Sequence, residues 1–150
     1  MLNSGVTMDE HTVELTDKFV AIYQNLDKQD LSVLQDIYHY DIVFEDPAHR
    51  IEGWSQLSHY FTRLFDAVEY CRFDISDHIC QGDTAYVQWI MTFKHSKLQS
   101  GNERLVHGCS RLKFADGKVI RHRDYFDMGE MIYEGIPVLG SIVRHLKARL

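Results

Sequence analysis

One stretch near the C-terminal end of the chain, VIRHRDYFDM at residues 119–128, combines residue types that acid–base chemistry uses. It follows a tight-turn signal, Asp116-Gly117, and its composition is typical of a β-strand. Side chains alternate between the two faces of a strand, so the residues expected on the core face are Ile120, His122, Asp124 and Phe126. The residues expected on the opposite face are Val119, Arg121, Arg123 and Tyr125. The alternation therefore separates Asp124 from both neighbouring arginines and weakens the interpretation of an ordinary surface ion pair.

Asp124 is the first candidate for an acid or a base. A carboxylate on the inner face of an apolar cavity is costly unless it is hydrogen-bonded, and desolvation favours the protonated form of a carboxyl group. His122 lies two residues away on the same predicted face, where an imidazole can tune the carboxylate or carry a proton. A buried Asp–His pair also occurs as a purely structural contact, so the sequence leaves both interpretations open.

Asp46 is a second candidate for the same cavity. It ends the stretch DIVFEDP at residues 41–47, in which Ile42, Phe44 and Asp46 share one face of a predicted strand that Pro47 terminates. One interpretation places Asp46 in the pocket beside these apolar residues. The other gives it only a structural role, as the first residue of an Asx-type turn with Pro47 and Ala48.

Three helices are predicted before the main run of strands. Thr7 and Glu10 have the spacing of a capping box, and the helix that follows carries the apolar residues Leu15, Phe19, Ile22 and Leu26. Asp30 can cap a short second helix with the buried face Leu31, Leu34, Ile37 and Tyr38. The third helix follows Gly53 and carries Trp54, Leu57, Phe61, Leu64, Phe65 and Val68.

Four further strands are predicted at residues 69–80, 84–96, 103–114 and 118–126, separated by short turns. Helices followed by an antiparallel meander indicate an α+β fold, in which the helices cover the concave face of a curved sheet. A last apolar segment is interrupted at Gly135 and Pro137 and then resumes at helical spacing from Leu139 to Leu150. This C-terminal helix could pack on the domain, cover the pocket, form a dimer contact or lie in a membrane surface.

Composition limits the classes of function. The chain has 150 residues, which fits one domain, and its net charge of −6 provides no basic field for nucleic acid. No apolar stretch reaches the roughly 20 residues of a membrane span, and the N-terminus lacks the pattern of a signal peptide. Three widely spaced cysteines suit a reducing compartment, and the nine histidines lack the spacings of metal sites. We therefore expect a cytoplasmic protein without a metal.

The order of these elements and two motifs resemble the nuclear transport factor 2-like superfamily, and within it the SnoaL-like and ketosteroid-isomerase-like proteins. The resemblance covers about Val13 to Asp127 and is carried by DLSVLQDIYHYDIVFEDP, by Gly53-Trp54 and by FADGKVIRHRDYFD. It implies a cone-shaped half-barrel, with three helices packed in a strongly curved, mostly antiparallel sheet around an apolar pocket. Residues 1–127 would form this domain, and residues 128–150 would be a helical extension of it. The resemblance also implies a homodimer through the convex face of the sheet.

The resemblance assigns roles to individual positions. The base of ketosteroid isomerases corresponds to Asp46, but the positions of its two oxyanion donors are taken by Ile22 and Ser110, with Tyr23 one residue from the first. We therefore do not expect steroid isomerisation. The acid or base that polyketide cyclases and limonene-epoxide hydrolases carry in the last strand corresponds to Asp124. The hydrolases also need an Arg-x-Asp, and this chain has Gln88 and Ile90 there, which argues against epoxide hydrolysis.

The sequence thus predicts a SnoaL-like protein in which Asp124, Asp46 and His122 catalyse proton transfer of the isomerase or cyclase type, without a cofactor, on a small hydrophobic carbonyl compound. The predicted ligand-binding residues are Ile22, Tyr23, Phe44, Phe61, Trp89, Ser110 and Phe126. The alternative is a non-catalytic dimeric module that binds a small molecule or another protein.

Overall fold

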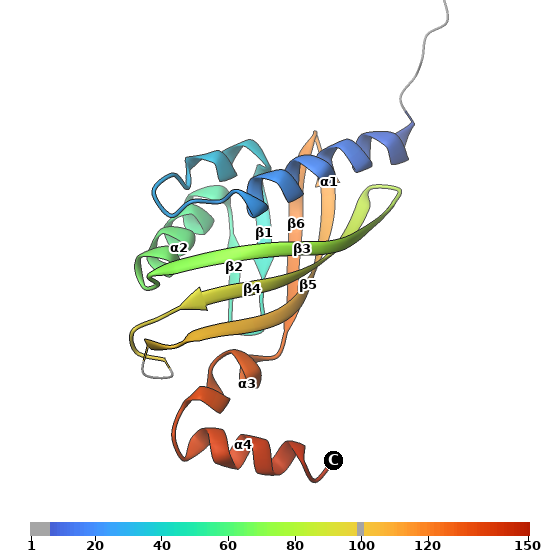
Figure 1. Ribbon diagram of the computed structural model, residues 1–150. Coiled ribbons are helices and arrows are strands. Elements are labelled where there is room, and N and C mark those ends of the chain that lie inside the picture. The colour runs from blue at the N-terminus through green and yellow to red at the C-terminus, as the bar shows by residue number, and fades with distance from the viewer. Residues whose placement is uncertain (1–6, 99–100) are drawn as a thin grey trace, which may run out of the picture.

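The computed structural model describes residues 7–98 and 101–150 (Figure 1). Its single curved sheet has the strand order β2-β1-β6-β5-β4-β3, and all neighbours are antiparallel except the parallel pair β1 and β6. The strands are β1 (Tyr38–Glu45), β2 (Arg50–Glu52), β3 (Tyr70–Gln81), β4 (Thr84–Lys94), β5 (Glu103–Ala115) and β6 (Lys118–Phe126). The predicted α+β architecture, a mostly antiparallel sheet bent around helices, is confirmed.

Two α-helices lie against the sheet, α1 (Met8–Gln24) and α2 (Trp54–Asp66). The predicted capping box is present at the start of α1, where Thr7 Oγ1 accepts from Glu10 N and the Glu10 carboxylate accepts from Thr7 N. Gly53 precedes α2 with a φ of 85°, a backbone conformation that other residues rarely adopt. The chain can therefore turn sharply from β2 into α2.

The second predicted helix is shorter than expected. It is the 3₁₀ turn η1 (Ser32–Asp36), in which Asp30 Oδ1 accepts hydrogen bonds from the backbone and the side chain of Ser32. Tyr38 was predicted on this helix but begins strand β1, where it pairs with Val119 of β6. Pairing with the sheet ends the helix, because a residue cannot belong to both elements.

A bulge in β6 corrects part of the predicted alternation. Phe114 pairs with Val119 and Lys113 pairs with Arg121, so Ile120 is one extra residue on β6. Val119, predicted on the outer face, is fully buried, whereas the alternation holds from Arg121 to Phe126. The bulge thus shifts the register once, before the residues of interest, and His122 and Asp124 still face inward.

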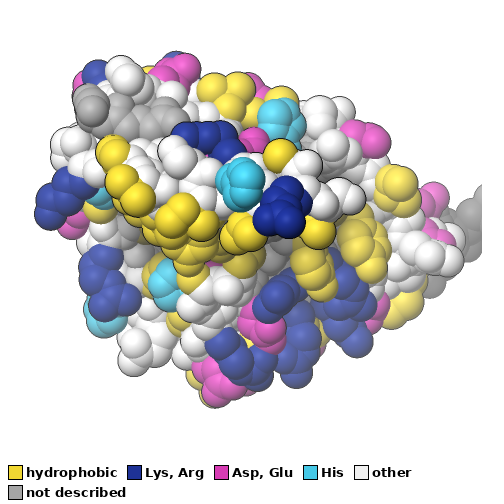
Figure 2. Space-filling model, turned by 90° about the horizontal axis from the view of Figure 1, so that it is seen from below, with side chains coloured by type: hydrophobic (Ala, Val, Ile, Leu, Met, Phe, Trp, Pro, Cys, Tyr) yellow, Lys and Arg dark blue, Asp and Glu magenta, His cyan; other side chains and the backbone are white. Residues whose placement is uncertain are grey.

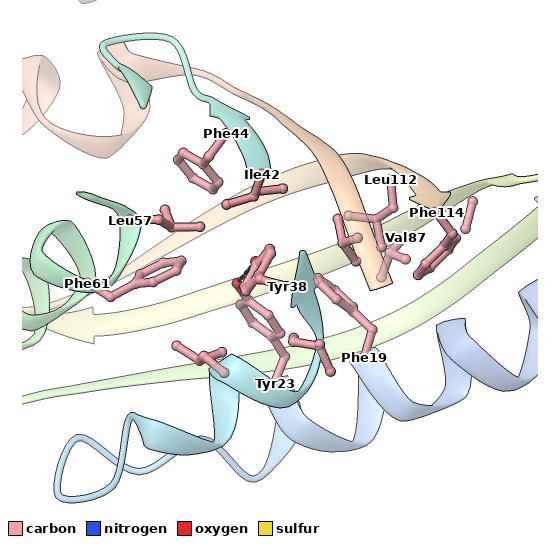
Figure 3. Packing of buried hydrophobic residues seen from close by; sticks show 14 of the residues in the cluster. Phe19, Tyr23, Tyr38, Ile42, Phe44, Leu57, Phe61, Val87, Leu112 and Phe114 are labelled. Atoms are coloured by element: carbon pink, nitrogen blue, oxygen red, sulfur yellow. Dashed lines mark hydrogen bonds between the residues drawn. The ribbon is translucent and has the colours of Figure 1, made fainter. Parts of the chain in front are cut away.

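The core lies between the concave face of the sheet and the helices (Figure 3). Tyr38 occupies its centre, with Phe19 and Tyr23 of α1 on one side and Phe61 of α2 on another. Beyond the core toward α3, a second cluster of Val68, Trp89, Met91, Phe93 and Val106 continues the apolar lining. The polar candidates therefore stand in a mostly aromatic environment.

The C-terminal segment forms α3 (Met128–Met131), the 3₁₀ turn η3 (Tyr133–Gly135) and α4 (Leu139–Lys147), beyond the end of the sheet (Figure 1). Asp127 caps α3 and pairs with Lys147, which ties α4 back to α3. Several apolar side chains of α4 stay exposed, and Figure 2 shows hydrophobic side chains gathered across this end of the molecule. Within residues 7–98 and 101–150, no helix is long and apolar enough to cross a membrane.

Candidate active site

A cavity of about 390 Å³ opens between the concave face of the sheet, α1, α2 and α3. Most of its lining is apolar, and the side chains with polar groups among the lining residues include Tyr23, Asp46, His49, Tyr60, His95, Ser110, His122 and Asp124. The three predicted catalytic residues, Asp124, Asp46 and His122, therefore border one cavity. α3 contributes Met128 and Met131 to the lining, whereas no residue of α4 takes part. The part of the C-terminal extension that borders the cavity is α3 with the residue that follows it, Ile132.

Six of the seven predicted ligand-binding residues line this cavity: Tyr23, Phe44, Phe61, Trp89, Ser110 and Phe126. Ile22 is the exception, because it is half-buried and packs against the core without reaching the cavity. Helix geometry explains the correction: Phe19 and Tyr23, four residues apart, share the inward face of α1, and Ile22 lies about 100° from Tyr23 around the helix.

Among the residues that the structure describes, Asp124 makes hydrogen bonds with one of its two carboxylate oxygens. Oδ1 accepts a hydrogen bond of 2.5 Å from Ser110 Oγ and one of 2.6 Å from His122 Nε2. Oδ2 has no hydrogen-bond partner among the residues that the structure describes. The side chain is 17% exposed and borders the cavity, so one oxygen is fixed and the other is available.

A chain of buried hydrogen bonds positions this carboxylate from both sides. Trp89 Nε1 donates to Ser110 Oγ at 2.9 Å, which leaves the serine proton for Asp124. On the other side, His122 Nδ1 is 2.8 Å from the Tyr38 hydroxyl, and that hydroxyl bonds to the hydroxyl of Tyr23. Residues from α1, β1, β4, β5 and β6 therefore converge on one carboxylate.

The protons in this chain have one arrangement that leaves no hydroxyl unsatisfied. Tyr23 donates to Tyr38, and Tyr38 donates to His122 Nδ1, so the neutral imidazole carries its proton on Nε2 and donates it to Asp124. Burial raises the pKa of both tyrosines well above the usual value near 10.0, so they keep their protons. In this arrangement Oδ1 of Asp124 accepts hydrogen bonds from both His122 and Ser110.

Asp46 is held more completely. Oδ1 accepts from the backbone of Ala48 at 2.8 Å and of His49 at 2.7 Å, as in the predicted Asx-type turn. Oδ2 accepts from the Tyr60 hydroxyl at 2.9 Å, and His49 Nδ1 lies within 3.1 Å of both oxygens. Burial, followed by the charge of Asp46, raises the pKa of Tyr60 far above its usual value, so Tyr60 stays a donor. Both interpretations of Asp46 thus hold in part, since it forms the turn and borders the cavity.

Several contacts of the site were missed from the sequence. Tyr38 was expected on a helix, and Tyr60 and His49 were not singled out. Tyr60 lies one residue before Phe61 in a helix whose inward stripe is aromatic, which is a weak signal for a second polar position. The link between Tyr38 and His122 joins residues 84 positions apart, which no local pattern encodes.

The positions expected to hold the Arg-x-Asp of an epoxide hydrolase do not face the cavity. Trp89 points inward and lines it, so Gln88 and Ile90 on either side of it point to the outer face of β4. This placement settles the orientation of β4, which the sequence left open.

Comparisons with known proteins identify the family and the fold. The model of the SnoaL-like domain matches residues 19–122, which covers most of the chain. The chain belongs to the SnoaL-like domain family. No curated protein matches this SnoaL-like chain in sequence.

Solved structures share the fold at low sequence identity. AclR, a hydroxylase candidate from Streptomyces galilaeus, is 20% identical with a TM-score of 0.70, over 95% of this chain and 92% of AclR. A candidate SnoaL-like polyketide cyclase from Jannaschia sp. CCS1 is 18% identical with a TM-score of 0.68, over 85% of this chain and 92% of that one. An LEH-like epoxide hydrolase from M. tuberculosis is 18% identical with a TM-score of 0.68, over 95% of this chain and 99% of that one. At this identity the likeness establishes the fold and not the reaction.

Proposed function

We propose that this SnoaL-like protein catalyses proton transfer, of the isomerase or cyclase type, on a small hydrophobic molecule that carries a carbonyl group. The observation that carries the proposal is the divided role of Asp124, whose side chain lines an apolar cavity: Oδ1 is held by Ser110 and His122, while Oδ2 has no hydrogen-bond partner among the described residues. A structural acid would have both oxygens satisfied, as Asp46 has.

In the proposed reaction Oδ2 of Asp124 removes a proton from the carbon next to the carbonyl. The electron pair of the broken C–H bond moves into an enolate, and the protonated carboxyl group then returns the proton to carbon at the same or another position. General acid–base catalysis by a positioned group typically contributes about 10²–10⁴ in rate. His122 positions the carboxylate, because its Nε2 proton keeps Oδ1 occupied and leaves Oδ2 to react.

Asp46 and Tyr60 have a different proposed role. The Asp46 carboxylate already accepts hydrogen bonds from two backbone amides and from Tyr60, so both of its oxygens are occupied. We assign Asp124 as the base, while Asp46 and Tyr60 form a polar contact surface for a hydroxyl or carbonyl at another part of the ligand. The ligand class is therefore a mostly apolar molecule with at least one oxygen substituent.

The size and lining of the cavity support this class of ligand. A volume of about 390 Å³ lies within the range of small-molecule pockets. Aromatic side chains from several elements surround the cavity. Among those from the strands, the ring of Trp89 meets Phe73 edge-on and Phe126 at a tilt. Such a lining favours flat or ring-containing apolar molecules over charged ones.

Exchange of hydrogen for deuterium tests the proposal without knowledge of the final product. A panel of hydrophobic ketones is incubated with the protein in D₂O, and mass spectrometry measures deuterium at the carbon next to the carbonyl. We expect at least one member to exchange faster with the protein than without it, and Asp124→Asn to remove the acceleration. Exchange that is equal for the native protein and Asp124→Asn would exclude Asp124 as the base.

The second candidate function is a non-catalytic module that binds a small molecule. It is favoured by the lack, among the described cavity residues, of a hydroxyl donor that is not already used: Ser110 donates to Asp124, and Tyr60 donates to Asp46. An enolate would then lack a dedicated donor. Mass spectrometry of molecules that co-purify with the protein, combined with the exchange assay, separates the two functions, because a bound compound with no exchange supports the module.

The proposal includes a homodimer and a cytoplasmic location. Large apolar side chains are exposed on the outer face of the sheet, among them Tyr86, Leu105 and Tyr125 at about half of their surface or more, and these support pairing with a second copy. The three cysteines, Cys71, Cys80 and Cys109, are all free thiols, which supports a reducing compartment. Analytical ultracentrifugation measures the oligomeric state directly.

A further inference from the structure

The outer face of the sheet carries a second hollow, on the opposite side from the apolar cavity. It measures about 360 Å³, and β5 and β6 line it with three arginines, Arg111, Arg121 and Arg123. Glu45 of β1, together with His122 and Tyr125 of β6, completes the polar part of the lining. Arg121 and Arg123 flank His122 on β6, so they alternate with the inward residues and cannot reach Asp124.

The strand register places like charges directly opposite one another on this face. Arg111 pairs with Arg123, and Lys113 pairs with Arg121. Cross-strand pairs of like charge destabilise a sheet. Asp83 offsets the charge of Lys113 at 3.6 Å, but the two cross-strand pairs still concentrate positive charge on this face.

The protein supplies only part of that negative charge. Arg123 donates to Glu45 at 2.7 Å, but Glu45 also accepts from Arg50. Arg111 Nε reaches only the Tyr86 hydroxyl, at 3.3 Å. Arg121 is exposed and has no ion pair or side-chain hydrogen bond with any residue in the described ranges, 7–98 and 101–150. A local surplus of positive charge thus stands in a chain whose net charge is −6.

We propose that this hollow binds an oxyanion, a phosphate or carboxylate group, through Arg111 and Arg121. The planar guanidinium group presents paired N–H donors that match the oxygens of both anions. Arg123 is held in place by Glu45 and by the ring of Tyr125, whose centroid is 5.2 Å from the guanidinium carbon. It therefore adds its charge to the hollow without moving. The hollow shares His122 with the apolar cavity and lies on the sheet face that supports pairing with a second copy, so the oligomeric state is measured together with anion binding.

Titration with inorganic phosphate and, separately, with acetate tests the site and distinguishes the two classes of anion. NMR spectra of the ¹⁵N-labelled protein at low ionic strength follow the backbone amides of β1, β5 and β6. We expect saturable shifts confined to these strands with at least one of the two anions, and an affinity at least about tenfold lower for Arg121→Gln and for Arg111→Gln. Arg149→Gln, which removes the same charge at the far C-terminal end, is the matched control and should bind like the native protein.

Stability and oligomeric state complete the test. Arg121→Gln removes one like-charge pair, so its melting temperature without added anion should be equal to or above that of the native protein, and lost binding then does not reflect unfolding. The site is refuted if neither anion gives saturable shifts or if Arg149→Gln weakens binding as much as Arg121→Gln does. It is also refuted if Arg121→Gln dissociates a dimer that phosphate does not affect, because a second copy would then be the occupant.

Discussion

Gly108 of β5 leaves the space that the indole of Trp89 occupies, and a methyl group there should disturb both the packing and the site. A Cβ built on Gly108 lies 2.6 Å from Trp89 Cζ3 and closer still to Cζ2 and Cη2. Carbon atoms in contact are normally about 3.5–4.0 Å apart, so the ring would have to move by about 1 Å or more. Trp89 is 4% exposed and meets Phe73 and Phe126, so it has little room to move.

We therefore expect Gly108→Ala to lower the free energy of unfolding by about 1–3 kcal/mol, as overpacking usually does, and the melting temperature by roughly 3–10 °C. Displacement of the indole should also lengthen the bond from Nε1 to Ser110 and change the tryptophan fluorescence. Thermal unfolding followed by circular dichroism and fluorescence measures both effects. Cys109→Ala, at the neighbouring residue that points to the outer face, is the control and should change the stability little. A Gly108→Ala protein with native stability and fluorescence would refute the packing described for Trp89.

Three further predictions concern the hydrogen-bond network, alkaline pH and the C-terminal segment. Tyr38→Phe should cost about 1–3 kcal/mol of stability in urea unfolding, because it leaves both the His122 imidazole and the Tyr23 hydroxyl without a partner. Tyr23→Phe removes only the terminal donor and should cost about 0.5–1.5 kcal/mol. Equal costs would contradict the proposed direction of donation. Burial raises the pKa of the Cys71 thiol from 9.0 to about 12, so above pH 9 the unfolded chain loses a proton that the native state keeps, and stability should fall with rising pH by up to about 1.4 kcal/mol per pH unit. Cys71→Ala should show a shallower slope of stability against pH between pH 9 and 11. An unchanged slope would contradict this prediction. The Lys147 ammonium lowers the pKa of Asp127. The support that Asp127 gives to α3 is therefore present above the ordinary carboxyl pKa and is lost as the pH falls through the lowered value. Asp127→Asn should speed hydrogen exchange of the first amides of α3 at neutral pH, and protection equal to the native protein would contradict this role.

Local patterns predicted most of the elements of this fold. The capping box at Thr7 and Glu10, the turn at Asp116-Gly117 and the aromatic stripe of α2 are each encoded within a few residues, and the structure contains all three. The failures concern the ends and irregularities of elements. The bulge at Ile120 depends on how β6 pairs with β5 and β1. Tyr38 belongs to a strand and not to a helix because it pairs with β6, which follows about 80 residues later in the chain.

The candidate site was predicted by residue type, by face and by the pairing of His122 with Asp124, but not by its partners from other strands. Alternation placed Asp124 and His122 on the inner face correctly, because that rule is local. The sequence could not predict that only Oδ1 of Asp124 is hydrogen-bonded among the described residues. This difference between the two oxygens depends on Ser110 from the neighbouring strand and on an imidazole fixed by Tyr38. Ile22 was misplaced because it was assigned by a count along the family resemblance, whereas the inward face of α1 is defined by Phe19 and Tyr23.

The most direct test of the central claim compares Asp124→Asn with Asp46→Asn in the deuterium-exchange assay on one ketone that the native protein accelerates. The account predicts that Asp124→Asn lowers the exchange rate by about 10²–10⁴ while the ketone still binds, and that Asp46→Asn lowers it far less. If Asp46→Asn removes exchange and Asp124→Asn leaves it unchanged, the assignment of Asp124 as the base is wrong.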